Sequence, residues 1–295
     1  MREKLSAFVI TYNRASLLET CLRAVSFADE LIVIDKSSTD DSADVAGRYA
    51  NRLEIVPWSP TVEATRAFAL SLCRHDRILF LDDDEILSRE SGYYLSNELN
   101  WLDVDIHAIP YRHYILGEHD ERAYYWPEAR QCLFRKGAIE FTSTVHNGVV
   151  VKSDRIAAVP LHSGVCIHHL SHPDVASFIE RTNRYTSCED RERVSGEQGD
   201  LARFAHDQID FWMRRTGDRS TDDYPTAVAV LRAVYDIVDR LKMWEEARGI
   251  DGAEMLRDAQ ARLAAVENLI ARKSGRALGS ALARTVQPEF VCTST

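Results

Sequence analysis

Short apolar runs that alternate with helical patterns constrain the fold of this 295-residue chain more than any other feature. The runs lie at residues 7–10, 31–35, 53–56 and 77–81, and the helical patterns between them lie at residues 17–25, 40–49 and 62–73. Each run is apolar throughout, which is typical of strands in a parallel sheet that helices cover on both faces. We therefore expect an α/β fold with a mostly parallel sheet flanked by helices.

The pattern changes twice further along the chain. Short strand-like pieces follow at residues 106–111, 131–134 and 148–152. From residue 174 the periodicity becomes helical, with helices expected at residues 174–184, 201–215, 225–248 and 253–273 and a charged loop at 187–200. We expect a first domain over 1–173 with halves at about 1–105 and 106–173, an all-helical C-terminal region over 174–275, and a loosely held tail over 276–295.

Four consecutive acids, Asp82, Asp83, Asp84 and Glu85, follow the last apolar run. In an extended chain alternate side chains share a face, which would place Asp82 and Asp84 side by side. Oxygen ligands favour Mg²⁺ or Mn²⁺, and these ions complete their shells with water and substrate phosphates. The quartet predicts a divalent metal site for a substrate with a diphosphate; the alternative is an acidic loop that caps the next helix.

Polar clusters also follow two other expected strands, at residues 11–14 and 35–40. Ligands of open parallel sheets bind beyond the carboxyl ends of the strands. Because all three polar clusters fall at such ends, we expect them to converge on one ligand site.

Composition narrows the function classes. A net charge of -10 argues against a nucleic-acid partner, since such affinity comes mainly from clustered Lys and Arg. Six cysteines without framework spacing are expected to be thiols in a reducing cytoplasm. The apolar run at residues 5–10 is too short for a signal segment or a membrane span. Histidines 162, 168, 169 and 172 lack the spacing of common zinc sites.

Together, several segments resemble the family 2 glycosyltransferases of GT-A fold, particularly the lipopolysaccharide-core glucosyltransferase-like branch. The resemblance covers residues 5–187 approximately. In the nucleotide half it rests on Thr11-Tyr12-Asn13-Arg14, residues 29–35 with Ser38-Thr39-Asp40, residues 66–70 and residues 81–85. In the acceptor half it rests on Trp126-Pro127-Glu128, Leu133-Phe134-Arg135, Val145-His146-Asn147 and Ile167-His168.

The resemblance implies a Rossmann-like GT-A domain that binds a nucleoside-diphosphate sugar, with UDP favoured, and Mn²⁺ or Mg²⁺. It implies nucleotide-binding roles for Thr11, Tyr12, Asn13, Asp35, Arg66, Asp82 and Asp83. Metal ligands would be Asp84, Asp82 and His168. The chemistry agrees in part, because a carboxylate can accept the imide N–H of uracil and an arginine can neutralise a diphosphate.

By the same resemblance, the sugar moves with inversion to a hydroxyl of a glycan, a glycolipid or a lipid-linked acceptor. A carboxylate must take the proton of that hydroxyl, and Glu128 is the first candidate for this general base, with Glu140 second. Relatives commonly carry Glu at the position of Asn147, which cannot act as a base.

Three other functions stay open at this point. A nucleotidyltransferase would share the sheet and the acids, but residues 10–14 contain no glycine for a phosphate loop. A phosphatase would need Thr or Val shortly after Asp84. A non-catalytic nucleotide- or sugar-binding scaffold fits Asn147 and also Lys36, where many relatives carry an acid. Peripheral contact with the inner face of the membrane and a homo-oligomer are also left open.

Overall fold

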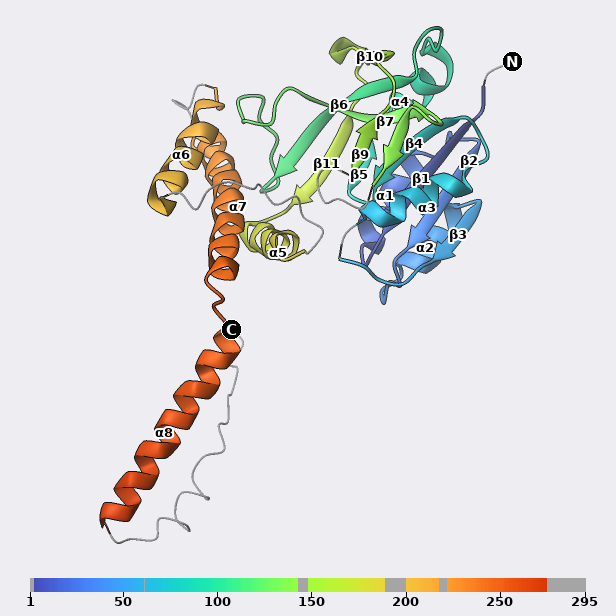
Figure 1. Ribbon diagram of the computed structural model, residues 1–295. Coiled ribbons are helices and arrows are strands. Elements are labelled where there is room, and N and C mark those ends of the chain that lie inside the picture. Colours follow the sequence, from blue (N-terminus) through green and yellow to red (C-terminus); the bar gives the residue numbers. More distant parts are fainter. Residues whose placement is uncertain (1–2, 61, 143–147, 189–199, 218–221, 275–295) are drawn as a thin grey trace. The chain divides into compact units, whose positions relative to one another are not determined.

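The computed structural model describes residues 3–60, 62–142, 148–188, 200–217 and 222–274 (Figure 1). Its contacts define two compact units, Met1–Lys242 and Met243–Thr295. The first unit contains every strand described below, together with two helices that follow them, at residues 175–186 and 201–214, and most of a third, at residues 224–247. The change from strands to helices expected near residue 173 therefore lies inside one compact unit.

The first four strands form a parallel sheet. β1 (Leu5–Thr11) lies between β2 (Glu30–Asp35) and β4 (Arg77–Asp82), and β3 (Arg52–Ile55) pairs with the outer side of β2. All residues of β1 and β2 are buried, as their continuous apolar runs predict. In the described part of the chain these strands belong to a nine-stranded, mixed sheet.

The second half of this sheet contains both strand directions. β7 (Glu128–Arg135) runs antiparallel between β4 and β6 (Ile106–Ile115), while β11 (Ile167–His172) and β10 (Ile156–Ala158) pair parallel with β6. β5 (Glu85–Leu87) pairs antiparallel with β11. A separate two-stranded sheet contains β8 (Ile139–Phe141) and β9 (Val149–Val151).

The helices of the first half follow from the strand order. α1 (Ala15–Ala24) and α2 (Ser42–Tyr49) connect strands in one direction across the sheet and contact each other. α3 (Glu63–Leu72) connects β3 to β4 in the opposite direction, so a right-handed crossover places it on the other face. Short helical turns lie at α4 (Ser91–Tyr93), η1 (Tyr94–Glu98) and η2 (Leu161–Ser163).

Four longer helices complete the described chain. α5 (Val175–Thr186) begins with a capping box between Asp174 and Ser177. α6 (Leu201–Arg214) and α7 (Tyr224–Ala247) follow, and α8 (Gly252–Ser274) belongs to the second unit. Within the described residues, none of the helices combines the length and apolar character that a bilayer crossing requires.

The core lies where the sheet meets its helices. Phe8 stacks on Phe80 with ring centroids 5.7 Å apart, and Phe141 of β8 packs edge-on against Phe80 at 5.1 Å. Each such fully buried apolar side chain contributes about 1.5–3 kcal/mol to folding. The expected α/β fold with a mostly parallel sheet is confirmed, as are the four C-terminal helices. Most of the expected charged loop and the tail lie outside the described residues.

Candidate active site

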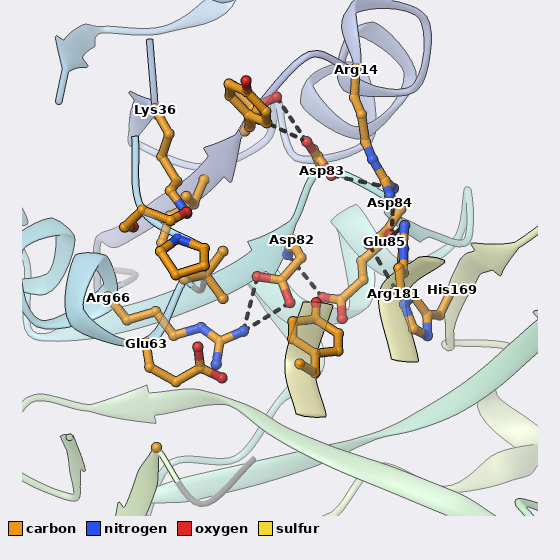
Figure 2. A pocket seen from close by; sticks show the side chains of 18 of the residues that line it. Arg14, Lys36, Glu63, Arg66, Asp82, Asp83, Asp84, Glu85, His169 and Arg181 are labelled. Atoms are coloured by element: carbon orange, nitrogen blue, oxygen red, sulfur yellow. Dashed lines mark hydrogen bonds and ion pairs between the residues drawn. The ribbon is translucent and has the colours of Figure 1, made fainter. Parts of the chain in front are cut away.

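A cavity of about 410 Å³ lies at the carboxyl ends of β1 and β4 (Figure 2). Side chains of α3, β6, β7, β11 and α5 form its other walls. Its charged lining consists of six basic residues and five acidic ones: Arg14, Lys36, Arg66, Arg130, Arg181, Arg184, Glu63, Asp82, Asp83, Asp84 and Glu85. A chain with a net charge of -10 therefore concentrates its cations here, as a polyanionic ligand requires.

The acid quartet spans the end of one strand and the start of another. β4 ends at Asp82, Asp83 and Asp84 form a turn, and Glu85 begins β5. The backbone oxygen of Asp84 accepts a hydrogen bond from Leu170 N at 2.9 Å, which ties the turn to β11. The expectation that Asp82 and Asp84 share one face of an extended chain is wrong, because the chain turns directly after Asp82.

Asp82 is bound by two arginines. Arg66 of α3 donates to both carboxylate oxygens, at 2.9 and 3.1 Å, and Arg130 of β7 donates at 3.2 Å. Burial by itself would raise the pKa of the Asp82 carboxyl, but the charges of Arg66 and Arg130 outweigh it and hold that pKa well below its usual range. Asp82 is therefore a fixed anion at neutral pH.

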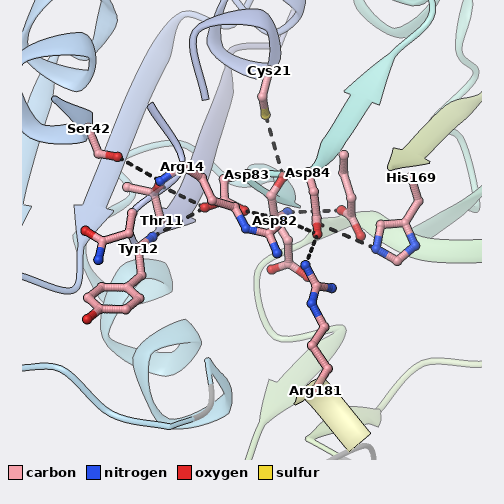
Figure 3. A network of polar contacts seen from close by, with 12 residues as sticks. Thr11, Tyr12, Arg14, Cys21, Ser42, Asp82, Asp83, Asp84, His169 and Arg181 are labelled. Atoms are coloured by element: carbon pink, nitrogen blue, oxygen red, sulfur yellow. Dashed lines mark hydrogen bonds and ion pairs between the residues drawn. The ribbon is translucent and has the colours of Figure 1, made fainter. Parts of the chain in front are cut away.

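Asp84 lies in a different environment (Figure 3). Its Oδ2 accepts from Arg14 at 2.6 Å and from Arg181 of α5 at 3.3 Å, while its Oδ1 lies 3.6 Å from Nε2 of His169. Burial raises the pKa of the Asp84 carboxyl, and the attraction of Arg14 does not fully compensate. Asp84 is thus a buried carboxylate that still gains from additional positive charge.

Asp83 points back toward the end of β1. Its Oδ2 accepts from Thr11 Oγ1 at 2.8 Å and from the backbone N–H of Tyr12 at 3.3 Å (Figure 3). Burial, together with repulsion from Asp84, raises the pKa of Asp83 to about 7. Two predicted nucleotide-binding residues, Thr11 and Asp83, are therefore bonded to each other.

Glu85 anchors the floor of the pocket. It is 1% exposed, it accepts from the hydroxyl of Tyr111 at 2.5 Å and from the backbone N–H of Asp82 at 3.0 Å, and it contacts Arg130. The guanidinium of Arg130 also lies 4.7 Å from the ring centroid of Phe80. These contacts hold Arg130 beside Asp82.

The remaining walls bring aromatic rings and further cations to the pocket. Tyr12 and Trp58 lie with ring centroids 6.1 Å apart. Lys36 donates to the backbone oxygen of Ser59 at 2.6 Å, and burial, followed by repulsion from Arg184, lowers the pKa of its amine to about 8. The Arg184 guanidinium lies over the ring of Tyr185 at 5.2 Å.

Several predicted site residues lie elsewhere. Asp35 is buried and accepts from the backbone N–H and the hydroxyl of Ser38 at 2.9 and 2.5 Å, so its carboxylate stabilises the turn after β2. The Asn13 side chain accepts from Thr39 N at 2.7 Å and lines a neighbouring cavity. Glu140 of β8 faces Lys152 at 2.6 Å, with 57% of its side chain exposed.

His169 and His172 line the pocket, whereas the expected His168 does not. His168 accepts or donates a hydrogen bond at 2.9 Å with Tyr114 and contacts Cys166, and it does not line the cavity. Its neighbour His169 points the other way along β11 and reaches Asp84. His146 and Asn147 lie outside the described residues.

Glu128 stands at the start of β7, near the pocket but not in its lining. Its carboxylate is 49% exposed, and its Oε2 lies 2.8 Å from Nε2 of His113. Glu128 and Arg130 share a face of β7, because alternate residues of a strand point the same way. The exposed carboxylate is thus open to a substrate that approaches from outside.

We tested whether these residues fit a divalent ion. Mg²⁺ bonds of about 2.1 Å allow two ligand atoms of one ion to lie at most about 4.2 Å apart. The 3.6 Å between Asp84 Oδ1 and His169 Nε2 satisfies this limit. Among the described side chains, no set of three or more His, Cys, Asp or Glu is already arranged around one point. Two protein ligands nevertheless suit Mg²⁺ or Mn²⁺, which usually keep waters and bind substrate phosphates.

Sequence reasoning missed much of the basic lining. Arg130 could have been found from its spacing, since it lies two residues after Glu128 on the same strand face. Arg181 and Arg184 are three residues apart on one helical face, but nothing local distinguishes them from surface arginines. His169 could not be chosen over His168 without the orientation of β11.

Comparison with known proteins identifies the domain. The family described as glycosyl transferase family 2 matches residues 6–149. An uncharacterized glycosyltransferase of Rickettsia felis is 29% identical over 205 residues, which cover 65% of this chain and 71% of the relative. The lipopolysaccharide core biosynthesis glycosyltransferase LpsC of Rhizobium meliloti is 26% identical over 159 residues, covering 50% of this chain and 57% of LpsC.

Solved structures show more distant similarity. Residues 1–349 of TarS from S. aureus match with 14% identity over 84% of this chain and 93% of that chain, at a TM-score of 0.42. Glucosyl-3-phosphoglycerate synthase of Mycobacterium tuberculosis, in complex with Mn²⁺, UDP and glucosyl-3-phosphoglycerate, matches with 22% identity over 37% of this chain, at a TM-score of 0.32. The match spans less than half of that synthase, 44% of its chain. Residues 6–149, which contain the acid quartet, therefore form a glycosyltransferase family 2 domain.

Proposed function

We propose that this glycosyltransferase binds a nucleoside-diphosphate sugar, with UDP favoured, in the pocket at the ends of β1 and β4. It then transfers the sugar with inversion to a hydroxyl of a glycan, a glycolipid or a related acceptor. The observation that carries this proposal is the concentration of six basic side chains beside four consecutive acids in one cavity. That arrangement suits a diphosphate and a divalent ion together.

The basic side chains take the diphosphate. Arginine offers paired N–H donors that match phosphate oxygens, and its charge persists at any physiological pH. Arg66 and Arg130 remain with Asp82, whereas Arg184 and Lys36 face the cavity from the α5 and β2 sides. Tyr12 and Trp58, which also line the cavity, suit stacking on the nucleotide base.

Asp84 and His169 would hold Mn²⁺ or Mg²⁺, with His169 in the role for which we expected His168. When bound, the ion supplies Lewis-acid assistance to the departing diphosphate. Asp82 keeps its arginines and orients them for the nucleotide, so its expected part as a metal ligand becomes secondary. Arg14 and Arg181 neutralise the second oxygen of Asp84.

Glu128 is the proposed general base. Its carboxylate is half exposed and is fixed through Oε2 to His113, so Oε1 would take the proton of the acceptor hydroxyl. General bases of this kind contribute about 10²–10⁴ to the rate. Glu140, the second candidate, is paired with Lys152 away from the cavity. We place this reaction in the cytoplasm. A lipid-linked glycan as acceptor would bring the enzyme to the inner face of the membrane.

The test is a calorimetric titration with UDP and GDP, each with and without Mn²⁺, followed by a donor hydrolysis assay. Binding that needs Mn²⁺, together with slow hydrolysis of a UDP-sugar, supports the proposal. Absence of nucleotide and ion uptake at millimolar concentrations contradicts it. Tight binding without turnover on any acceptor favours a non-catalytic scaffold.

A further inference from the structure

Three side chains from three adjacent strands connect the exposed base to the proposed metal site. Glu128 Oε2 lies 2.8 Å from His113 Nε2, and His113 Nδ1 lies 3.0 Å from His169 Nδ1. His169 Nε2 then faces Asp84 Oδ1 at 3.6 Å. The sheet register produces this row, because His169 pairs with His113 across β11 and β6, and Glu128 opposes Tyr111 across β7 and β6.

The hydrogen-bonded series Glu128–His113–His169 determines which ring nitrogens carry hydrogen. An ionised Glu128 can only accept, so His113 Nε2 must donate to it. With Nε2 as the hydrogen-bearing nitrogen of His113, its Nδ1 accepts, and the hydrogen between the two rings belongs to Nδ1 of His169. This leaves a lone pair on His169 Nε2, directed at the Asp84 carboxylate. Two acceptors that face each other at 3.6 Å are stabilised by a cation between them.

Packing fixes both rings in this arrangement. His169 is stacked on Tyr111 with centroids 5.1 Å apart, and His113 meets the same ring edge-on at 4.6 Å. Tyr111 is itself anchored through its hydroxyl to Glu85.

We propose that His113 is a positioning residue that couples the two sides of the reaction: it accepts the Nδ1 hydrogen of His169, which turns the Nε2 lone pair toward the divalent ion, and it holds the base Glu128. The inference rests on the proposed function. Hydrogen-bond partners of metal-binding histidines typically change metal affinity 10- to 100-fold when removed.

Two variants of the full chain separate hydrogen bonding from packing. His113→Phe keeps a ring against Tyr111 but has no acceptor. His113→Asn loses the ring but keeps an oxygen near the position of Nδ1. His75→Phe is the matched control, because His75 does not line the cavity. Mn²⁺ alone is titrated into each protein without nucleotide, and the electron paramagnetic resonance signal of free Mn²⁺ gives the affinity. Thermal unfolding shows that each variant is folded.

We expect Mn²⁺ to bind His113→Phe about 10- to 100-fold more weakly than the unmodified chain, with His113→Asn within about threefold of it and His75→Phe unchanged. Equal affinity of the unmodified chain and His113→Phe overturns the inference and leaves the proposed function intact. A larger loss in His113→Asn than in His113→Phe also overturns it, since packing would then explain the effect. If the unmodified chain takes up no Mn²⁺, this inference fails, and the nucleotide titrations with Mn²⁺ decide on the proposed function.

Discussion

Asp82 and Asp84 are two residues apart at the same strand end, yet their surroundings act on them in opposite directions. Arg66 and Arg130 hold the pKa of Asp82 well below its usual range, whereas burial raises the pKa of Asp84 despite Arg14 and Arg181. The partners of Asp82 come from α3 and β7, inside the family match, whereas two of the partners of Asp84, His169 and Arg181, come from β11 and α5, outside it, and the third, Arg14, lies inside it. The charge of Asp82 is already compensated by its arginines, whereas Asp84 still favours an additional cation.

The largest expected effect is on the Asp84 side. Asp84→Asn should lower turnover about a thousandfold, because it removes the anionic oxygen that faces His169 while the amide keeps the shape of the side chain. The free energy of unfolding should change by less than about 1 kcal/mol, since a buried carboxylate with a raised pKa is itself unfavourable. Near-normal turnover on a UDP-sugar would show that Asp84 binds no catalytic ion.

Asp82→Asn should lower the free energy of unfolding. Removal of one partner from a buried ion pair costs about 3–5 kcal/mol, and we expect about 3 kcal/mol because the Asp82 side chain is 26% exposed. Arg66 and Arg130 would lose their common anion. Urea unfolding of Asp82→Asn and Asp84→Asn side by side measures the contrast. Equal losses of stability in the two variants would remove the distinction between the two acids.

Glu128→Gln tests whether loss of the proposed base lowers kcat without changing nucleotide binding on the Asp82 side of the site. The amide can still accept from His113 but cannot take a proton, so kcat should fall about a hundredfold with UDP affinity within about twofold. Steady-state kinetics and UDP titration measure the two quantities. Glu140→Gln is the matched control and should leave kcat unchanged. A normal kcat in Glu128→Gln would assign the base to another carboxylate.

The smallest effect concerns Asp83, between the two acids. Its pKa is about 7 in the folded protein, against an ordinary value of 3.8, so between these pH values the folded protein holds a proton that the unfolded chain has released. Rising pH then disfavours folding. Asp83→Asn cannot titrate, and its stability relative to the unmodified chain should increase by about 2 kcal/mol from pH 5 to pH 8. Parallel stability curves of metal-free protein over this range would contradict the shift.

The parallel half of the fold could be predicted from sequence because its signals are local. The runs within β1, β2 and β4 are apolar throughout, and each is followed by polar residues at the ligand-binding edge. This pattern predicts the acids and Thr11 at the site, whereas Arg66 is assigned there by the resemblance. Asp35 was assigned to the nucleotide by resemblance, whereas its carboxylate bonds to Ser38.

The rest of the site depends on contacts between distant segments. The turn at Asp83 and Asp84 is fixed by Leu170, and the choice of His169 over His168 follows from the register of β11 on β6. No periodicity encodes either feature. Arg181 enters the pocket only because α5 packs against β11, which single-sequence reasoning does not reveal.

The position of α5 along the chain has a consequence for biosynthesis. The segment that matches the family ends at residue 149, before the ribosome has added Arg181 and Arg184. A nascent chain of that length contains the first strands and the acids but lacks two of the cations that line the cavity, and it also lacks His169. The growing polypeptide therefore acquires the complete basic lining of this cavity only after α5 has been synthesised and has packed against β11.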